Sequence, residues 1–126
     1  MHKSRLGNIV IDVQGTDLWE HAVFWSAALG CPLPGRPEKA EKFIQLQTRP
    51  GEVQVILQAV EHPPRVHLDI ETDDIVKEVA RLQRAGATVF AEREKWVVMQ
   101  APSGHRFCVG RPFRAGFDAG ASAWRD

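Results

Sequence analysis

Three side chains of the kinds that transfer protons lie in two similar stretches of the sequence, and two of them, Asp12 and Asp69, occupy equivalent points. Asp12 closes the apolar run of "NIVIDV", and His67 and Asp69 alternate with apolar residues in "RVHLDIE". A pair of carboxylates can differ in pKa so that one gives a proton while the other takes one, and histidine serves in either role. These three residues are candidates for proton transfer. The alternative is that the carboxylates hold loops or ion pairs and that His67 is structural.

Strands of alternating polarity are predicted to position these candidates. In residues 8–13 and again in residues 66–71, apolar side chains recur at every second position, the pattern of a strand with one face on a core. The positions expected to pack under a helix are Ile9, Ile11, Val13, Val66, Leu68 and Ile70. Because side chains alternate between the two faces of a strand, the opposite face should carry Asn8, Val10, Asp12, His67 and Asp69.

A helix is predicted after each of these strands, and each helix ends at a glycine. The first is expected to follow the capping-box-like pair of Asp17 and Glu20 and to stop at Gly30. The second is capped by Asp73 or Asp74 and stops at Gly86. Side chains three or four positions apart form the buried stripes, which are Leu18, Ala22, Trp25 and Leu29 in the first helix and Ile75, Val79 and Leu82 in the second.

Further strands are predicted at residues 43–48, 53–60, 87–91, 96–101 and 105–110, with turn residues between them. The segment 32–37 holds three prolines, which exclude a regular ladder. Too many strands follow the second helix for a ferredoxin-like sandwich. We predict an α+β fold with one domain over residues 1–110, made of a module at about 8–60 and a module at about 66–110. The tail, 111–126, is either frayed or docked through its aromatic residues.

Composition and charge narrow the classes of partner. Sixteen basic residues balance sixteen acidic ones, so no overall field attracts nucleic acid or an anionic membrane. The two cysteines, Cys31 and Cys108, form no CxxC motif and are expected to be free thiols. The N-terminal apolar run is too short for a signal peptide or a spanning helix. We therefore expect a cytoplasmic protein whose partner is a small molecule or another protein, with no nucleic acid and no membrane.

Three segments resemble the vicinal oxygen chelate superfamily, the glyoxalase and bleomycin-resistance fold, and within it the glyoxalase-like subgroup. They are "FWSAALGCPL", "RVHLDIETDDIVKEVARLQRAGATV" and "WVVMQAPSGHRFCVG", which match that subgroup's FW-x-x-x-LG, HLD-x-x-x-DD and WV-x-x-x-x-P-x-G-x-x-FC patterns in order. The resemblance implies two βαβββ modules that form a curled mixed sheet around a cavity, with the helices outside. It also implies dimerisation, and we expect a homodimer.

Metal-using members of this superfamily bind a divalent ion through four inward positions, two in each module. Carried over to this sequence, the second module offers His67 and Cys108, and the first offers Gln58 with either Asn8 or Val10. One imidazole, one thiol and amides make a poor donor set for a divalent ion. We therefore favour no cofactor, with a divalent metal as the alternative. The vestigial metal positions Asn8, Gln58, His67 and Cys108 are instead ligand-binding candidates, although Cys108 is alternatively a packing residue.

Two further features suit ligand recognition. Trp96 begins a predicted strand, where its indole could line the cavity mouth and stack on a planar ligand. Arg106, Arg111 and Arg114 form a basic group late in the chain. Arginine suits carboxylate or phosphate recognition, and the alternative for these three is a solvated surface.

The sequence predicts a glyoxalase-like protein that binds a small molecule in the cavity of its curled sheet. One alternative is a lyase or isomerase of the vicinal oxygen chelate type, either metal-dependent or metal-free with His67, Asp69 and Asp12 as its catalytic residues. Another is a drug-sequestering resistance protein of the bleomycin-resistance type, which needs no catalytic group.

Overall fold

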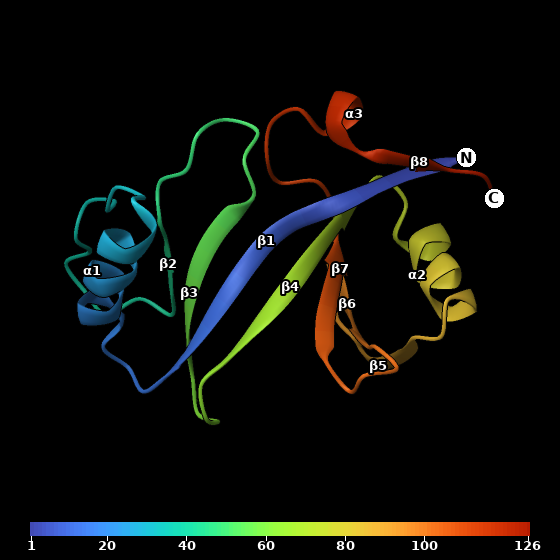
Figure 1. The fold of residues 1–126 in the computed structure, drawn as a ribbon. Helices are drawn as coiled ribbons and strands as arrows, with labels where there is room; N and C mark the ends of the chain where they lie inside the picture. Colours follow the sequence, from blue (N-terminus) through green and yellow to red (C-terminus); the bar gives the residue numbers. More distant parts are fainter. The chain divides into compact units, whose positions relative to one another are not determined.

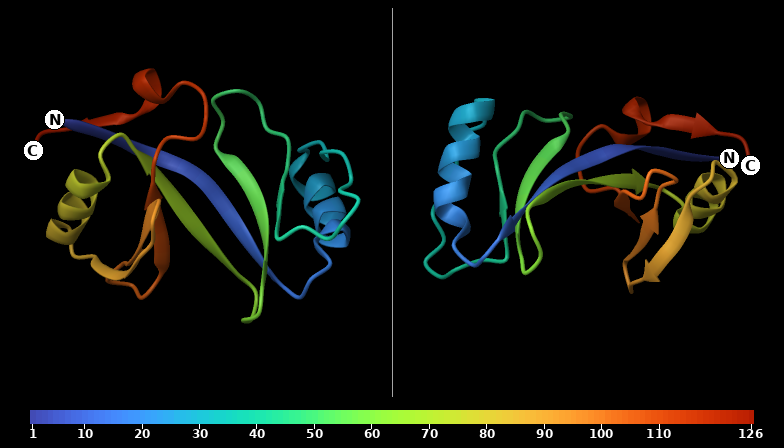
Figure 2. Two further views of the ribbon diagram at one scale, coloured as in Figure 1. Left: turned by 180° about the vertical axis from the view of Figure 1, so that it is seen from behind. Right: turned by 60° about the horizontal axis from the view of Figure 1, so that its bottom comes forward.

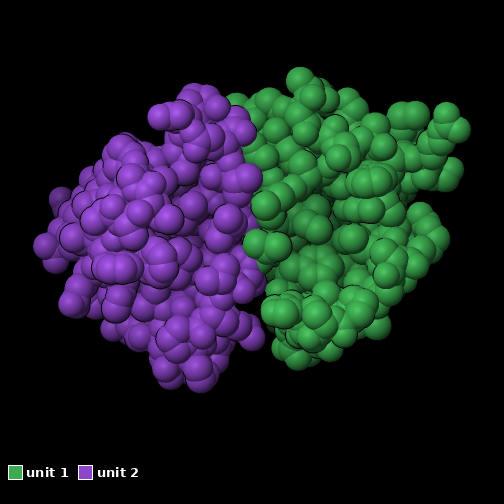
Figure 3. Space-filling model, viewed as in Figure 1, with its two compact units in different colours: residues 1–7, 68–126 green, residues 8–67 purple.

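The computed structural model describes residues 1–126 and divides them into two compact units, coloured separately in Figure 3. One unit comprises residues 8–67, and the other comprises residues 1–7 and 68–126. The strands β1 (His2–Gln14) and β4 (Arg65–Thr72) run through both units. The chain forms a mixed eight-stranded sheet and three helices, which confirms the predicted α+β class. None of the three helices has the length and apolar character needed to cross a membrane.

The unit of residues 8–67 is a three-stranded sheet with one helix on it (Figure 1). Its strands β2 (Phe43–Gln45), β3 (Gln54–Val60) and β1 lie in that order, with β3 parallel to β1 and antiparallel to β2. Helix α1 (Leu18–Leu29) packs on β2 and β3. The core between the helix and the sheet holds Ile11, Val13, Leu18, Ala22, Ile44, Leu46 and Leu57.

Helix α1 has the predicted ends but not the full predicted stripe. Gly30 takes the left-handed conformation at φ 70°, and its N–H donates to the carbonyl of Ser26. Asp17 occupies the N-cap position, but its side chain makes no capping hydrogen bond, so the predicted capping box does not form. Leu29 was predicted to be buried and is 48% exposed, because Cys31 and Leu33 from the next segment pack against this core instead.

In the other unit, one helix covers a four-stranded sheet (Figure 2). Its strands are ordered β4, β7 (Arg106–Gly110), β6 (Trp96–Gln100) and β5 (Thr88–Glu92). Helix α2 (Ile75–Arg84) begins at Asp74, whose carboxylate accepts from the N–H of Lys77. It lies against β5, β6 and β7, and its predicted stripe of Ile75, Val79 and Leu82 packs against Ala87, Met99 and Val109.

The predicted burial of strand β4 is correct only at its end. Ile70 packs against the core under α2, whereas Val66 and Leu68 are 55% and 45% exposed. The physical reason is that α2 lies on β5, β6 and β7, beyond the first half of β4. Val66 and Leu68 are therefore apolar side chains that their own chain leaves open to solvent.

The two modules share a topology, with one difference. In each, the first strand pairs in parallel with the last strand of the same module, β1 with β3 and β4 with β7. The second module is the predicted βαβββ unit, but the first has only β2 and β3 after its helix. The missing strand would lie in residues 31–42, where Pro32, Pro34 and Pro37 lack the N–H groups that a ladder needs.

The tail is docked rather than frayed, which decides between the two sequence-based alternatives. It forms the short helix α3 (Phe117–Gly120) and strand β8 (Ser122–Trp124), and β8 pairs antiparallel with His2–Ser4 of β1. The chain ends lie side by side in Figure 2, and the N-terminal ammonium is 2.8 Å from Asp126 Oδ2. Farther from the chain ends, the side chain of Arg5 and the backbone N–H of Phe113 both donate hydrogen bonds to the buried carboxylate of Glu71.

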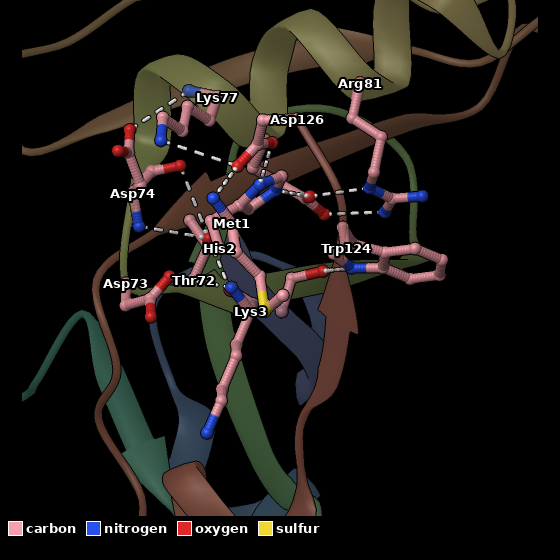
Figure 4. Close-up of polar contacts among 12 residues, drawn as sticks. Met1, His2, Lys3, Thr72, Asp73, Asp74, Lys77, Arg81, Trp124 and Asp126 are labelled. Atoms are coloured by element: carbon pink, nitrogen blue, oxygen red, sulfur yellow. Dashed lines mark hydrogen bonds and ion pairs between the residues drawn. The ribbon is translucent and has the colours of Figure 1, made fainter.

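The buried side chain of His2 links the C-terminal residue to helix α2 (Figure 4). His2 is 2% exposed, with Nδ1 2.6 Å from Asp126 Oδ1 and Nε2 2.8 Å from Glu78 Oε1. Glu78 is also held by Arg81, whose guanidinium lies over the Trp124 ring at 3.8 Å. A hydrogen bond from the N-terminal ammonium lowers the pKa of Asp126 to about 2, with His2 adding to it. Burial raises the pKa of Glu78, but hydrogen bonds from Arg81 and His2 outweigh it and leave that pKa lowered.

Candidate functional site

Asp12 lies at the centre of a cluster of titratable side chains in the unit of residues 8–67. Its side chain is 1% exposed, and Oδ2 accepts a hydrogen bond from His67 Nδ1 at 2.9 Å. Arg65 Nε is 3.5 Å from the same oxygen, and His62 Nε2 is 3.9 Å from it. The other oxygen, Oδ1, is buried and has no hydrogen-bond partner in the protein. One oxygen of this buried carboxylate thus has three side-chain nitrogens within 4 Å, of which those of His67 and Arg65 donate hydrogen bonds to it, and the other oxygen accepts no hydrogen bond.

Strand register places this cluster on the face of the sheet opposite α1. Ile11 and Val13 pack under the helix, so Asp12 between them points the other way, as alternation predicted. In the parallel pair of β1 and β3, Asp12 lies opposite Gln58, whose side chain therefore shares that face. The turn between β3 and β4 then supplies His62, and β4 supplies Arg65 and His67.

This arrangement is suited to binding and to moving a proton. The hydrogen bond from Nδ1 to Asp12 fixes the orientation of the His67 ring, and histidine is a side chain that can take up or release a proton. A buried acceptor with no partner costs about 1–3 kcal/mol unless a donor reaches it. Asp12 Oδ1 is therefore suited to accept a hydrogen bond from a small molecule.

His62 and Arg65 were not predicted as site residues. Both lie in the segment "EHPPR", which reads as a connection between the modules. The available signal was the shortness of that segment, because it forces its polar side chains to remain near the end of β3, where Gln58 had been identified.

The four metal positions implied by the family resemblance do not fit one ion. Asn8 lies opposite Gln54, whereas Gln58 lies opposite Asp12. These amides are therefore four residues apart along neighbouring parallel strands, or about 13 Å at roughly 3.3 Å per residue. A divalent ion holds its ligands within about 2.0–2.6 Å, so Asn8 and Gln58 cannot share one. Val10, the other candidate, has no donor atom in its side chain.

A different set of donors gathers around β4. Asp69 lies opposite Cys108 in the parallel pair of β4 and β7, and His67 is two residues before Asp69 on the same strand face. One ligand atom from each of these three residues lies within 4.8 Å of the others. Asp69 is the member that the resemblance did not provide. Neither Cys31 nor Cys108 forms a disulfide, as predicted.

Trp96 lies farther along the same face as Cys108. It is opposite Gly110 in the pair of β6 and β7, and its side chain is 45% exposed. A pocket of about 220 Å³ lies elsewhere, between the start of α1 and residues 36–41. None of the residues predicted to bind a ligand or to act in catalysis lines it.

Comparison with known proteins identifies the class. The model of the glyoxalase-like domain family matches residues 8–110, which is most of the chain. This chain therefore belongs to the glyoxalase-like domain family. Among curated proteins, none matches it.

Solved structures of low identity share the fold. A glyoxalase/bleomycin resistance protein/dioxygenase superfamily member from Vibrio splendidus 12B01 is 21% identical with a TM-score of 0.54, over 86% of this chain and all of that one. Methylmalonyl-CoA epimerase from Mycobacterium tuberculosis is 18% identical with a TM-score of 0.59, over 86% and 87% of the two chains. A homoprotocatechuate 2,3-dioxygenase variant from B. fuscum is 14% identical with a TM-score of 0.60, over 91% of this chain and 34% of that one.

Proposed function

We propose that this chain is a glyoxalase-like small-molecule-binding protein whose ligand contacts Asp12, His67 and Gln58. The observation that carries the proposal is the carboxylate of Asp12, which is buried on the sheet face away from α1 with one oxygen bonded to His67 and the other open to a donor. Buried polar groups in proteins almost always have partners. The curled sheet around a ligand cavity, implied by the family resemblance, is part of this proposal.

The same groups define what the ligand must offer. It carries a hydroxyl, amine or amide N–H that donates to Asp12 Oδ1, and a polar atom within reach of the Gln58 amide, which can donate or accept. Asn8 is a further ligand-binding candidate of this proposal, whereas Trp96 and Cys108 stay ligand-binding predictions from the sequence. We also propose that the protein acts in the cytoplasm as a homodimer and binds neither nucleic acid nor a membrane surface.

A second candidate is a metal-free lyase or isomerase, and the Asp12–His67 hydrogen bond favours it. Asp12 holds the imidazole in one orientation, while His67 would take a proton from one atom of the substrate and return it to another. Asp69 stays the alternative to Asp12 that the sequence offers as the carboxylate of this mechanism. No step requires a metal, in keeping with the separation of Asn8 from Gln58.

The proposal is tested by a fragment screen followed by nuclear magnetic resonance. Small polar compounds that bind should shift the side-chain amide signals of Gln58 and the ring signals of His67. Asp12→Asn should weaken the best of them by about tenfold, because it replaces a charge-assisted hydrogen bond with a neutral one. Gln47→Ala, at an exposed glutamine outside the cluster, is the control. Binders that shift only signals near Trp19 and Lys39, beside the other pocket, would refute the proposal.

A further inference from the structure

Arg106 differs from every other partly buried arginine of this protein. Four arginines are partly buried: Arg5, Arg81, Arg106 and Arg114. Arg5 and Arg114 pair with Glu71, and Arg81 pairs with Glu78. Arg106 has no carboxylate within ion-pair distance, although a partly desolvated guanidinium is normally retained with an acidic partner. Its charge is therefore available to an anion from outside the chain.

Aromatic and amide side chains hold this guanidinium in place. Its carbon Cζ lies 3.3 Å from the centre of the Phe90 ring, and Nε donates to Gln100 Oε1 at 3.4 Å. Phe90 lies at a register shift in β5 between Val89, which packs on the core, and Ala91, and it is 51% exposed. Stacking on the ring and the bond through Nε leave the two Nη groups as the donors for a bidentate contact.

On β6 and β7, the sheet face beside Arg106 is largely apolar. Phe107 and Val109 pack under α2, so Arg106, Cys108 and Gly110 lie on the opposite face of β7. Their neighbours on β6 in that face are Gln100, Val98 and Trp96. From Arg106 to the level of Trp96 the strip is four residues long, or about 13 Å.

We propose that this strip on β5, β6 and β7 binds a flat aromatic carboxylate, with the carboxylate on Arg106 and the ring system over Val98 and Cys108 toward Trp96. The planar guanidinium fork matches a carboxylate in geometry and in charge. The indole of Trp96, 45% exposed at the far end, provides a stacking surface for the rings. All residues of this site lie within residues 68–126, and neither Asp12 nor His67 is among them.

The probes are 2-naphthoate and its neutral counterpart 2-naphthamide, which have the same rings. Calorimetric titration of wild-type protein should show 2-naphthoate binding about tenfold more tightly than 2-naphthamide, because only the anion pairs with Arg106. Arg106→Gln should weaken 2-naphthoate by about tenfold and remove the preference for the anion. Trp96→Ala should weaken both probes, since it removes the stacking surface. Arg93→Gln, at an exposed arginine in the turn between β5 and β6, should bind like wild type.

Arg106→Lys provides a second variant that retains the charge but not the fork, and it should fall between wild type and Arg106→Gln. Melting curves of each variant establish that it is folded. Any of three results would overturn the inference. They are equal affinity of the wild type for both probes, an affinity of Arg106→Gln for 2-naphthoate equal to that of the wild type, and no binding of 2-naphthoate at about 10 mM. These results do not test the proposal at Asp12, which is tested through the signals of Gln58 and His67.

Discussion

Asp12 combines a structural and a proposed binding role in one side chain. Replacing it with alanine leaves His67 Nδ1 and Arg65 without their shared acceptor, so Asp12→Ala should lower the free energy of unfolding by about 1–3 kcal/mol. Asp12→Asn should cost less, because its amide oxygen still accepts from His67. Urea unfolding measures both, with Asp118→Ala, at a carboxylate that is 92% exposed, as the control. An Asp12→Ala protein as stable as wild type would show that these contacts contribute nothing.

Donor geometry at the metal positions leads to a second expectation for individual residues. Purified protein should contain no stoichiometric divalent metal, because Asn8 and Gln58 are too far apart to share an ion. If zinc binds at all, we expect it at His67, Asp69 and Cys108, since zinc accepts imidazole, carboxylate and thiolate donors. Elemental analysis and melting with added zinc, nickel, manganese and iron make the measurement. One metal per chain, with a metal-induced rise in melting temperature that His67→Ala abolishes, would contradict this expectation.

At the scale of elements, the docking of the tail should depend on pH. The pKa of Asp126 is lowered from 3.8 to about 2, and the pKa of Glu78 is lowered from 4.5. A carboxylate with a lowered pKa stabilises the folded state above its unfolded-state pKa, and this contribution is lost as the pH falls through the folded-state pKa. The tail should therefore remain docked above about pH 4.5 and detach as the pH falls toward about 2.

The readout is the indole N–H of Trp124, which donates to Ser4 Oγ at 2.8 Å. Its exchange with solvent should accelerate across that acid range, and Asp126→Asn should accelerate it at neutral pH as well. If the exchange rate of the Trp124 indole N–H stays unchanged down to about pH 2, the ion pairs of Asp126 and Glu78 do not hold β8 in place.

Local chemistry explains which elements the sequence could predict. The glycine at the end of α1 and the cap at Asp74 are set by neighbouring residues, and both were predicted. The burial of Leu29 and Leu68 was predicted wrongly, because it depends on where each helix lies on its sheet. Asp12 and His67 are in contact although they are 55 residues apart in the chain. The alternation of side chains predicted which face of the sheet each residue lies on, but it could not predict that the two would form a hydrogen bond.

At the scale of the whole molecule, we expect a homodimer. Helix α1 leaves three apolar side chains exposed, Val23 at 45%, Phe24 at 60% and Leu29 at 48%, and such surface commonly marks an interface. Light scattering at micromolar concentration should give twice the mass of the chain, and Phe24→Glu should shift it toward the monomer. Val76→Glu, at an apolar residue of α2 that is 79% exposed, is the matched control. A wild-type monomer under these conditions would rule the dimer out.

The central claim is that the sheet face carrying Asp12 binds a small molecule, and a crystal structure with the tightest compound from the fragment screen tests it most directly. We predict ligand density beside Asp12 and Gln58, with a donor atom of the ligand at hydrogen-bond distance from Asp12 Oδ1. Density confined to the 220 Å³ pocket beside α1, with Asp12 Oδ1 bound only to water, would contradict the claim.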